Sequence, residues 1–233
     1  MAILEVKDLE AYYGKAQALS GLTFSMEKGE SVGIIGPNGA GKSTLLSSIV
    51  GLTDWRGQIT FDGVDTRQLN PTKIVRLKIG YAPERGNVFS YMNVKENLLV
   101  GGYCARDEID RNMETVFELF PVLKVRQKQE AGTLSGGERQ MLSLARVFMS
   151  GPKLMLLDEP TLGLAPIVIS HISKAIENMK DMGFTILIAE QNALFTLKHS
   201  QRIFLLEWGR FAMEGTPEKL QEEDYVRQTY FGA

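Results

Sequence analysis

The chain has 233 residues, enough for one large domain with a substantial hydrophobic core. Its net charge of −2 gives no positive field that would favour nucleic acid as a partner, and one cysteine excludes an internal disulfide framework. No segment reaches the roughly 18 uncharged apolar residues of a membrane-spanning helix. The opening sequence MAILEVKDLE contains acids and is typical of a strand, not of a signal peptide. We therefore expect a cytoplasmic protein that reaches a membrane only through a partner.

In chain order, residues 1–61 are predicted to form short strands around one apolar strand, SVGIIG, and one helix, KSTLLSSIVGL. From about residue 87 to residue 150, apolar residues recur at helical spacing. Beyond residue 150, strands such as KLMLLD and FTILIAE alternate with helical segments, which indicates a mainly parallel sheet covered by helices. We predict one α/β domain, 1–233, with a core formed by 1–86 and 151–233 and a helical lobe at about 87–150.

Polar residues follow several of the apolar strands at the point where each strand ends. The strands SVGIIG, IGYAPE, KLMLLDE and TILIAEQ end at Gly36, Glu84, Asp158 with Glu159, and Glu190 with Gln191. Ligands of open α/β sheets bind outside the carboxyl ends of the strands. We therefore expect these residues to face one site.

The stretch GPNGAGKST matches the phosphate-binding loop G-x-x-x-x-G-K-[ST], with a strand before it and a helix after it. Its glycines let the backbone curl so that N–H groups surround phosphates; Lys42 is expected to reach the β- and γ-phosphates, and Ser43 to supply a hydroxyl to Mg²⁺. An ordinary glycine-rich turn is the alternative. The predicted nucleotide-binding residues of this loop are Gly36, Pro37, Asn38, Gly39, Ala40, Gly41, Lys42, Ser43 and Thr44.

The segment LMLLDEP places two acids after a buried strand. Unpaired charges at a core edge are costly, so these acids need a cation or a polar site. Beside a phosphate-binding loop, Asp158 is the expected Mg²⁺ partner, and Glu159 is placed to orient or deprotonate the water that attacks the γ-phosphate. The alternative is that the acids cap the next helix, although Thr161 is the better candidate for that cap.

The stretch TLSGGERQ opens a helix with two consecutive glycines. Ser135 and Glu138 fit a capping box, which any helix can use. Glycine costs roughly 1 kcal/mol relative to alanine inside a helix, so the cap does not explain Gly136 and Gly137. A glycine pair at the positive end of a helix indicates that something negative approaches the backbone closely.

Taken together, the phosphate-binding loop, LSGGERQ about a hundred residues later and LMLLDEP shortly after it resemble the ATP-binding cassette (ABC) ATPases over essentially the full chain. The resemblance implies a P-loop NTPase core with an N-terminal antiparallel β subdomain and a helical lobe. It also implies ATP and Mg²⁺ as cofactors, Mg-dependent ATP hydrolysis coupled to transport, and a second ABC ATPase subunit in a homo- or heterodimer. The signature residues Ser135, Gly136, Gly137 and Glu138 would then contact the ATP of the partner.

One further position follows from the same resemblance. Tyr13 occupies the place where the family stacks an aromatic ring on adenine; the alternative is that Tyr12 or Tyr13 only packs on a strand.

The chain departs from the usual family pattern at three positions. Glu84 replaces a glutamine: a carboxylate binds Mg²⁺ well but repels phosphate without the metal. Gln191 replaces a histidine that contacts the γ-phosphate, a catalytic position where glutamine still donates a hydrogen bond without carrying charge. Ala165 replaces an aspartate that helps couple the two sites of the dimer. His171 and His199 are expected at the surface.

These departures resemble the shorter ATPase subunit of branched-chain amino acid importers. Those importers combine two different ATPases, transmembrane permease subunits and an extracytoplasmic binding protein, which places the ATPase peripherally on the inner face of the cell membrane. Importers of urea or short amides are close alternatives. A soluble nucleotide-dependent switch with little hydrolysis is favoured by Gln191 and Ala165, but Glu159 argues against it. Soluble ABC ATPases that act on nucleic acid commonly fuse two cassettes, whereas this chain has one.

The region from Glu84 through GNVFSYMNVKENL lies between core and lobe. We expect it to form the groove that receives a helix of the membrane subunit, with Phe89, Tyr91 and Met92 as apolar contacts. Packing inside the lobe is the alternative for these three side chains.

Overall fold

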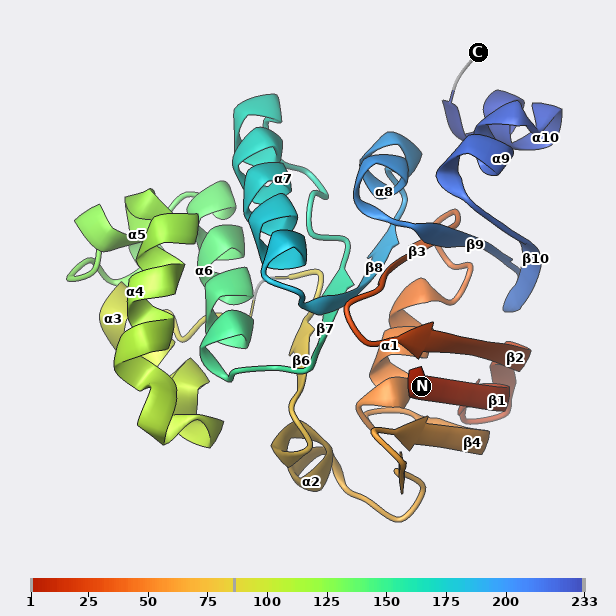
Figure 1. The fold of residues 1–233 in the computed structure, drawn as a ribbon, viewed down its shortest axis with the longest axis horizontal. Coiled ribbons are helices and arrows are strands. Elements are labelled where there is room, and N and C mark those ends of the chain that lie inside the picture. The colour runs from red at the N-terminus through yellow and green to blue at the C-terminus, as the bar shows by residue number, and fades with distance from the viewer. Residues whose placement is uncertain (1, 86, 232–233) are drawn as a thin grey trace.

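Two sheets organise the protein in the computed structural model, which describes residues 2–85 and 87–231 (Figure 1). In these described residues the first sheet is antiparallel and has the strand order β2-β1-β4-β5. Its strands are β1 (Ala2–Tyr13), β2 (Ala16–Glu27), β4 (Asp54–Phe61) and β5 (Val64–Asp65). The long hairpin of β1 and β2 contains several register shifts, which let the strands bend around the core.

The second sheet has the order β10-β9-β3-β8-β7-β6. Its strands are β3 (Ser31–Ile35), β6 (Ile79–Ala82), β7 (Leu154–Asp158), β8 (Thr185–Glu190), β9 (Arg202–Glu207) and β10 (Arg210–Gly215). All pairs from β9 to β6 are parallel, and β10 pairs antiparallel to β9. The central strands β3, β7 and β8 are buried throughout, as expected for apolar runs covered on both faces.

Successive residues of the central strands pack into two different cores. Leu154 and Leu156 face the antiparallel sheet and helix α1 (Lys42–Ile49), whereas Met155 and Leu157 face a layer of helices. This alternation is the period-two geometry of a strand. It places α1 between the two sheets (Figure 1).

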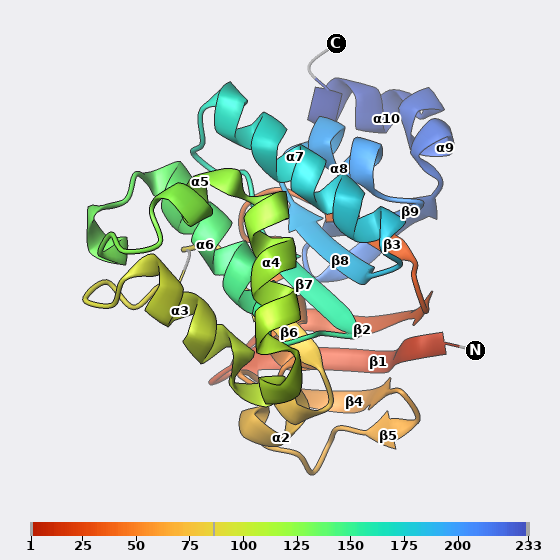
Figure 2. The ribbon, with the colours of Figure 1, turned by 60° about the vertical axis from the view of Figure 1, so that its left-hand side comes forward.

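The helical layer on the other face belongs mainly to the middle of the chain (Figure 2). Its helices are α3 (Val94–Gly101), α4 (Ile109–Leu119), α5 (Pro121–Val125), α6 (Gly136–Met149) and α7 (Pro166–Asp181). Short 3-10 turns occur at Gly102–Cys104, Arg106–Glu108 and Ala131–Thr133. The predicted boundary of the core at residue 86 falls outside the described residues, so the division into core and lobe stays a prediction.

The remaining elements close the edges of the fold. They are α2 (Pro71–Arg76), α8 (Ala193–His199), α9 (Pro217–Glu222), α10 (Asp224–Val226) and a π-helical turn (Arg227–Phe231). Leu220 and Val226 pack with α8 and β9 in a third apolar cluster. Among the described residues, none of the helices has the length and apolar content needed to span a bilayer.

The predicted fold class is confirmed: a mainly parallel sheet with helices, an antiparallel β subdomain and a set of helices on one side. The carboxyl ends of β3, β7 and β8 lie at the same edge, because these strands are parallel neighbours. This edge positions the candidate site.

Candidate nucleotide-binding site

The loop between β3 and α1 needs its glycines for close packing and for backbone conformation. A Cβ on Gly36 would lie 2.3 Å from the carbonyl oxygen of Leu206, closer than real contacts allow. Gly39 and Gly41 have φ angles of 80° and 109°, in the left-handed region. Gly41 is also the N-cap of α1 and provides no side-chain cap, so the first N–H groups of α1 point to the space where an anion can bind.

Lys42 lies folded over this loop. Its ammonium donates to the carbonyl oxygens of Gly36 at 2.7 Å and Pro37 at 3.2 Å, and it pairs with Glu159 Oε1 at 2.9 Å. Both charged side chains are 5% exposed. Removing either partner of such a pair leaves the other charge buried without a counter-ion, which strongly destabilises the folded protein.

The backbone holds Glu159 in an uncommon conformation. Its φ is 46°, although it is not a glycine, and its N–H donates to Ala189 O at 2.8 Å. Left-handed backbone at a non-glycine residue costs on the order of 1–3 kcal/mol and persists where the surroundings fix it. Glu159 Oε2 also accepts a hydrogen bond from the Gln191 backbone N–H at 3.1 Å. The carboxylate is therefore held between Lys42 of α1 and the main chain that follows β8.

Asp158 lies next to the first turn of α1. Its Oδ1 accepts a hydrogen bond from the Ser43 hydroxyl at 2.9 Å, and its Oδ2 accepts one from the Tyr81 hydroxyl at 3.0 Å. Burial raises the pKa of Asp158, and these two hydrogen bonds lower it in part. The described residues contain no group of three or more His, Cys, Asp or Glu side chains gathered to hold a metal ion. A hydroxyl beside one carboxylate instead fits Mg²⁺, which commonly uses one or two carboxylates together with the phosphates of its nucleotide.

Sequence reasoning placed Glu190 at this edge and treated Thr161 as a helix cap, but it did not predict that the two residues bond to each other. The Thr161 N–H and hydroxyl both donate to Glu190 Oε1, at 2.8 and 2.6 Å, and the Asn192 N–H donates to Oε2 at 3.2 Å. Burial, followed by the nearby charge of Glu159, raises the pKa of Glu190 to about 7. Thr161 does not cap the next helix, because α7 begins at Pro166 with Ala165 as its N-cap; that expectation is wrong. The signal available in the sequence was Glu190 itself, an acid at the end of the apolar strand TILIAE, which needs a bonding partner.

The comparisons with known proteins agree with this geometry. The profile of a family described as ABC transporter matches residues 19–162. The chain belongs to the ABC transporter family. As an ABC ATPase it binds nucleotide and hydrolyses ATP.

Relatives match this ABC ATPase over nearly its whole length. It is 45% identical over 232 residues to the high-affinity branched-chain amino acid transport ATP-binding protein BraG of Pseudomonas aeruginosa, covering 99% of this chain and 100% of that protein. It is 36% identical over 236 residues to the probable branched-chain amino acid transport ATP-binding protein LivF of Archaeoglobus fulgidus, covering 99% of both. The ADP conformation of MJ1267, an ATP-binding cassette of an ABC transporter, aligns with a TM-score of 0.82 at 28% identity, covering 100% of both chains.

Three other predicted site residues of this ABC ATPase lie near the same edge or are exposed beside it. Tyr13 is 59% exposed, and its hydroxyl lies 3.3 Å from the Thr44 hydroxyl in α1. Gln191 is exposed directly after β8. Glu84 is exposed beyond β6, and its charge contributes to the raised pKa of Asp158.

The signature segment lies elsewhere: α6 and α1 pack against opposite faces of the six-stranded sheet. The predicted capping box is confirmed, with Glu138 N–H donating to Ser135 Oγ at 3.3 Å and Ser135 N–H to Glu138 Oε2 at 2.9 Å. The two glycines differ. A Cβ on Gly137 would lie 2.7 Å from the Val168 side chain in α7, whereas a Cβ on Gly136 would meet nothing within 4 Å. Packing therefore requires Gly137, and nothing in the described part of the chain requires Gly136.

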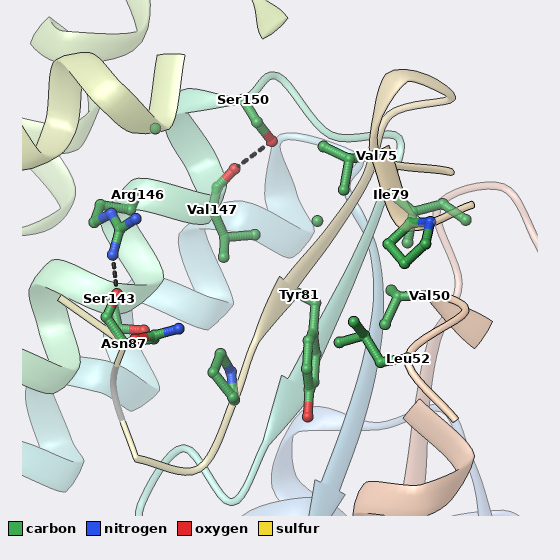
Figure 3. Close-up of a pocket in the computed structure, with 14 residues that line it drawn as sticks. Val50, Leu52, Val75, Ile79, Tyr81, Asn87, Ser143, Arg146, Val147 and Ser150 are labelled. Carbon is green, nitrogen blue, oxygen red and sulfur yellow. Dashed lines mark hydrogen bonds between the residues drawn. The ribbon is translucent and has the colours of Figure 1, made fainter. Parts of the chain in front are cut away.

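A groove of about 460 Å³ opens between α1, α2, β6, α3 and α6 (Figure 3). Its walls include Val50, Leu52, Val75, Ile79, Tyr81 and Arg146. The Arg146 guanidinium lies 4.6 Å from the centre of the Phe89 ring, and its Nε has no hydrogen-bond partner among the described residues. Phe89, Tyr91 and Met92 are 46%, 97% and 37% exposed. They do not pack inside the helical layer.

One histidine differs from expectation. His171 is exposed as predicted, but His199 is fully buried in α8, where its Nε2 lies 2.8 Å from Ser173 Oγ. Burial lowers the pKa of His199 to about 4, so this histidine is neutral near pH 7. The prediction that His199 lies at the surface is wrong because α8 turns this side of its helix toward α7.

Proposed function

We propose that this ABC ATPase hydrolyses ATP to drive an importer of branched-chain, hydrophobic amino acids. One observation carries the catalytic part: Lys42, Ser43, Asp158 and Glu159 meet where β3 and β7 end. The substrate part is supported by the 45% identity to BraG along the whole length of both chains.

ATP binding would exchange the partners of Lys42. Phosphate oxygens compete with Glu159 for the ammonium, because they carry more charge and enter the same loop. When Lys42 turns to the β- and γ-phosphates, the Glu159 carboxylate is free to accept a proton from a water molecule. The water oxygen then attacks the γ-phosphorus, the bond to the bridging oxygen breaks, and ADP and phosphate leave. The Gln191 side chain would donate a hydrogen bond to the γ-phosphate while its main chain holds Glu159.

Ser43 and Asp158 would hold Mg²⁺, with the exposed Glu84 facing the same edge. When bound, the ion neutralises charge that develops on the β- and γ-phosphate oxygens. Tyr13 would stack on the adenine ring, since its side chain is exposed and its hydroxyl reaches the first turn of α1.

A second ABC ATPase subunit would complete the site, as a copy of this chain or as a related chain. Ser135, Gly136, Gly137 and Glu138 would then approach the γ-phosphate bound by the partner. The free space around Gly136 supports this assignment, because it leaves room for an anion from outside the chain at the N-terminus of α6.

Transmembrane permease subunits would dock a helix into this groove, with the exposed Phe89, Tyr91 and Met92 as further apolar contacts outside its lining. Such docking places the ATPase on the cytoplasmic, inner face of the cell membrane, where it acts only indirectly on an extracytoplasmic binding protein. Closure of the two ATPases on ATP would move the helical lobe and the docked helices with it.

An uptake assay in cells tests the catalytic role of Glu159 and the proposed substrate together. Cells in which the Glu159→Gln variant replaces the parent chain are expected to lose uptake of radiolabelled leucine and to keep uptake of radiolabelled urea. Glu177→Gln, at a half-exposed position of α7, is the matched control and should leave leucine uptake intact. Loss of urea uptake with unchanged leucine uptake would contradict the substrate, and unchanged uptake of both would contradict the catalytic role of Glu159.

A further inference from the structure

Tyr81 lies in the wall of the groove between α1, α2, β6, α3 and α6, which we call the docking groove. It also reaches the edge of the sheet where β3, β7 and β8 end, which we call the nucleotide edge. It lies on β6, the edge strand of the parallel sheet, where it pairs with Leu156 of β7. Its half-buried ring stands in the wall of the groove beside Leu52 (Figure 3). Its hydroxyl points away from the groove and donates to Asp158 Oδ2 at 3.0 Å.

The carboxylate of Asp158 is therefore fixed at both oxygens. Ser43 binds Oδ1 on the nucleotide side, and Tyr81 binds Oδ2 on the groove side. With Oδ2 occupied, Oδ1 is the oxygen left next to the Ser43 hydroxyl for a cation. Mg²⁺ demands near-ideal octahedral geometry, so the orientation of one carboxylate controls how well it binds.

We propose that Tyr81 is a positioning residue that links occupancy of the groove to metal binding at Asp158. The inference rests on the proposed function, in which Asp158 holds the metal and the groove receives a permease helix. A helix seated in the groove touches the Tyr81 ring, and any shift of the ring changes the hydrogen bond at its other end. Hydrogen bonds weaken steeply with distance and angle, so small ring movements suffice.

The first experiment measures Mn²⁺ binding to the ATP-loaded protein by electron paramagnetic resonance, with Mn²⁺ as the probe for the Mg²⁺ site. Tyr81→Phe keeps the ring and removes the hydroxyl; it is expected to weaken Mn²⁺ binding roughly tenfold, the effect of one hydrogen bond to a charged group. Tyr12→Phe removes a comparable hydroxyl from Glu10 and is expected to change nothing. Asp158→Asn should weaken binding more than Tyr81→Phe.

The second experiment fills the groove. In a Cys104→Ser background, Leu52→Cys provides one thiol in the groove wall, because Leu52 is 61% exposed. Attaching a pyrene maleimide there is expected to change the Mn²⁺ affinity by about threefold or more when Tyr81 is present, and not in the Tyr81→Phe variant.

The outcomes distinguish a failure of the proposed metal site at Asp158 from a failure of the proposed link through Tyr81. If Asp158→Asn weakens Mn²⁺ binding while Tyr81→Phe does not, the metal site stands and the link through Tyr81 is overturned. Equal effects of the label with and without the Tyr81 hydroxyl would also overturn it. If Asp158→Asn leaves Mn²⁺ binding unchanged, the proposed metal site falls and the inference falls with it. Circular dichroism of each variant, which should match the parent, assigns any change to the site and not to unfolding.

Discussion

The nucleotide edge and the signature segment at the start of α6 differ in burial and in how their groups are bonded within the chain. At the edge, Lys42, Asp158, Glu159 and Glu190 are all buried, and each is hydrogen bonded or ion paired inside the chain. At the start of α6, Gly136 has open space around the position of a side chain, and the helix end needs only its capping box. The edge gathers buried charged groups that are bonded to one another or to the main chain, whereas the start of α6 has open space beside Gly136.

This difference in packing indicates which of the predicted site residues also contribute to the stability of the fold. Lys42 and Glu159 stabilise each other as a buried ion pair, so removal of either one is expected to affect the fold and the proposed chemistry together. Gly137 serves the fold through its contact with Val168, while Gly136 is free of such a role. Variants at the two regions should therefore separate stability from function.

The largest effect on stability is expected from Lys42→Met. Removing one partner of a buried ion pair leaves Glu159 charged and unpaired, which costs about 3–5 kcal/mol in the free energy of unfolding. Denaturant unfolding without nucleotide measures it. The double variant Lys42→Met with Glu159→Gln should recover most of the loss, because neither charge then remains. A single variant as stable as the parent would show that the pair is not formed in solution.

Glu190 should make stability depend on pH. Burial raises its pKa to about 7 in the folded protein, from the ordinary value of 4.5, so its contribution to stability is fully present below pH 4.5 and is lost as the pH rises toward 7. The loss amounts to up to about 3 kcal/mol. Glu190→Gln removes this titration, so the difference in unfolding free energy between variant and parent should change across this range. The opposite titration of His199 cancels in that difference. A difference that stays constant from pH 4.5 to 8 would contradict the prediction.

The two signature glycines should respond differently to alanine. Gly137→Ala drives a methyl group into Val168 and is expected to lower the free energy of unfolding by about 1–3 kcal/mol. Gly136→Ala, its matched control, should leave stability equal or raise it by up to about 1 kcal/mol. Thermal unfolding of the isolated chain measures both. Equal destabilisation by the two variants would remove the distinction between them.

The smallest effect is expected from Tyr13→Ala, which removes the proposed adenine contact. Loss of one aromatic stacking partner, worth about 1 kcal/mol, should weaken ATP binding several-fold with little change in stability, because Tyr13 is exposed. Titration with a fluorescent ATP analogue measures the affinity, and GTP should lose less than ATP if the contact selects adenine. Unchanged affinity would assign Tyr13 to packing on β1.

Local patterns predicted the strands, the loop between β3 and α1 and the cap of α6, because each depends on residues close in sequence. The convergence of strand ends also followed, since parallel strands share an edge. The partners at that edge did not follow. Ser43 and Asp158 are 115 positions apart, and Tyr81 meets Asp158 only because β6 pairs with β7. The burial of His199 likewise depends on α7 packing over α8, which helical periodicity alone does not specify.

The most direct measurement is the mass in solution of the Glu159→Gln protein, by light scattering, with and without Mg-ATP. If the signature of one copy completes the nucleotide edge of another, the mass should rise from 25.9 kDa to twice that value, about 52 kDa, only when Mg-ATP is present. Gly136→Trp, which fills the open space at the signature, should abolish the doubling while ATP binding persists. A protein that binds ATP and stays at 25.9 kDa would contradict completion of the site by a second copy.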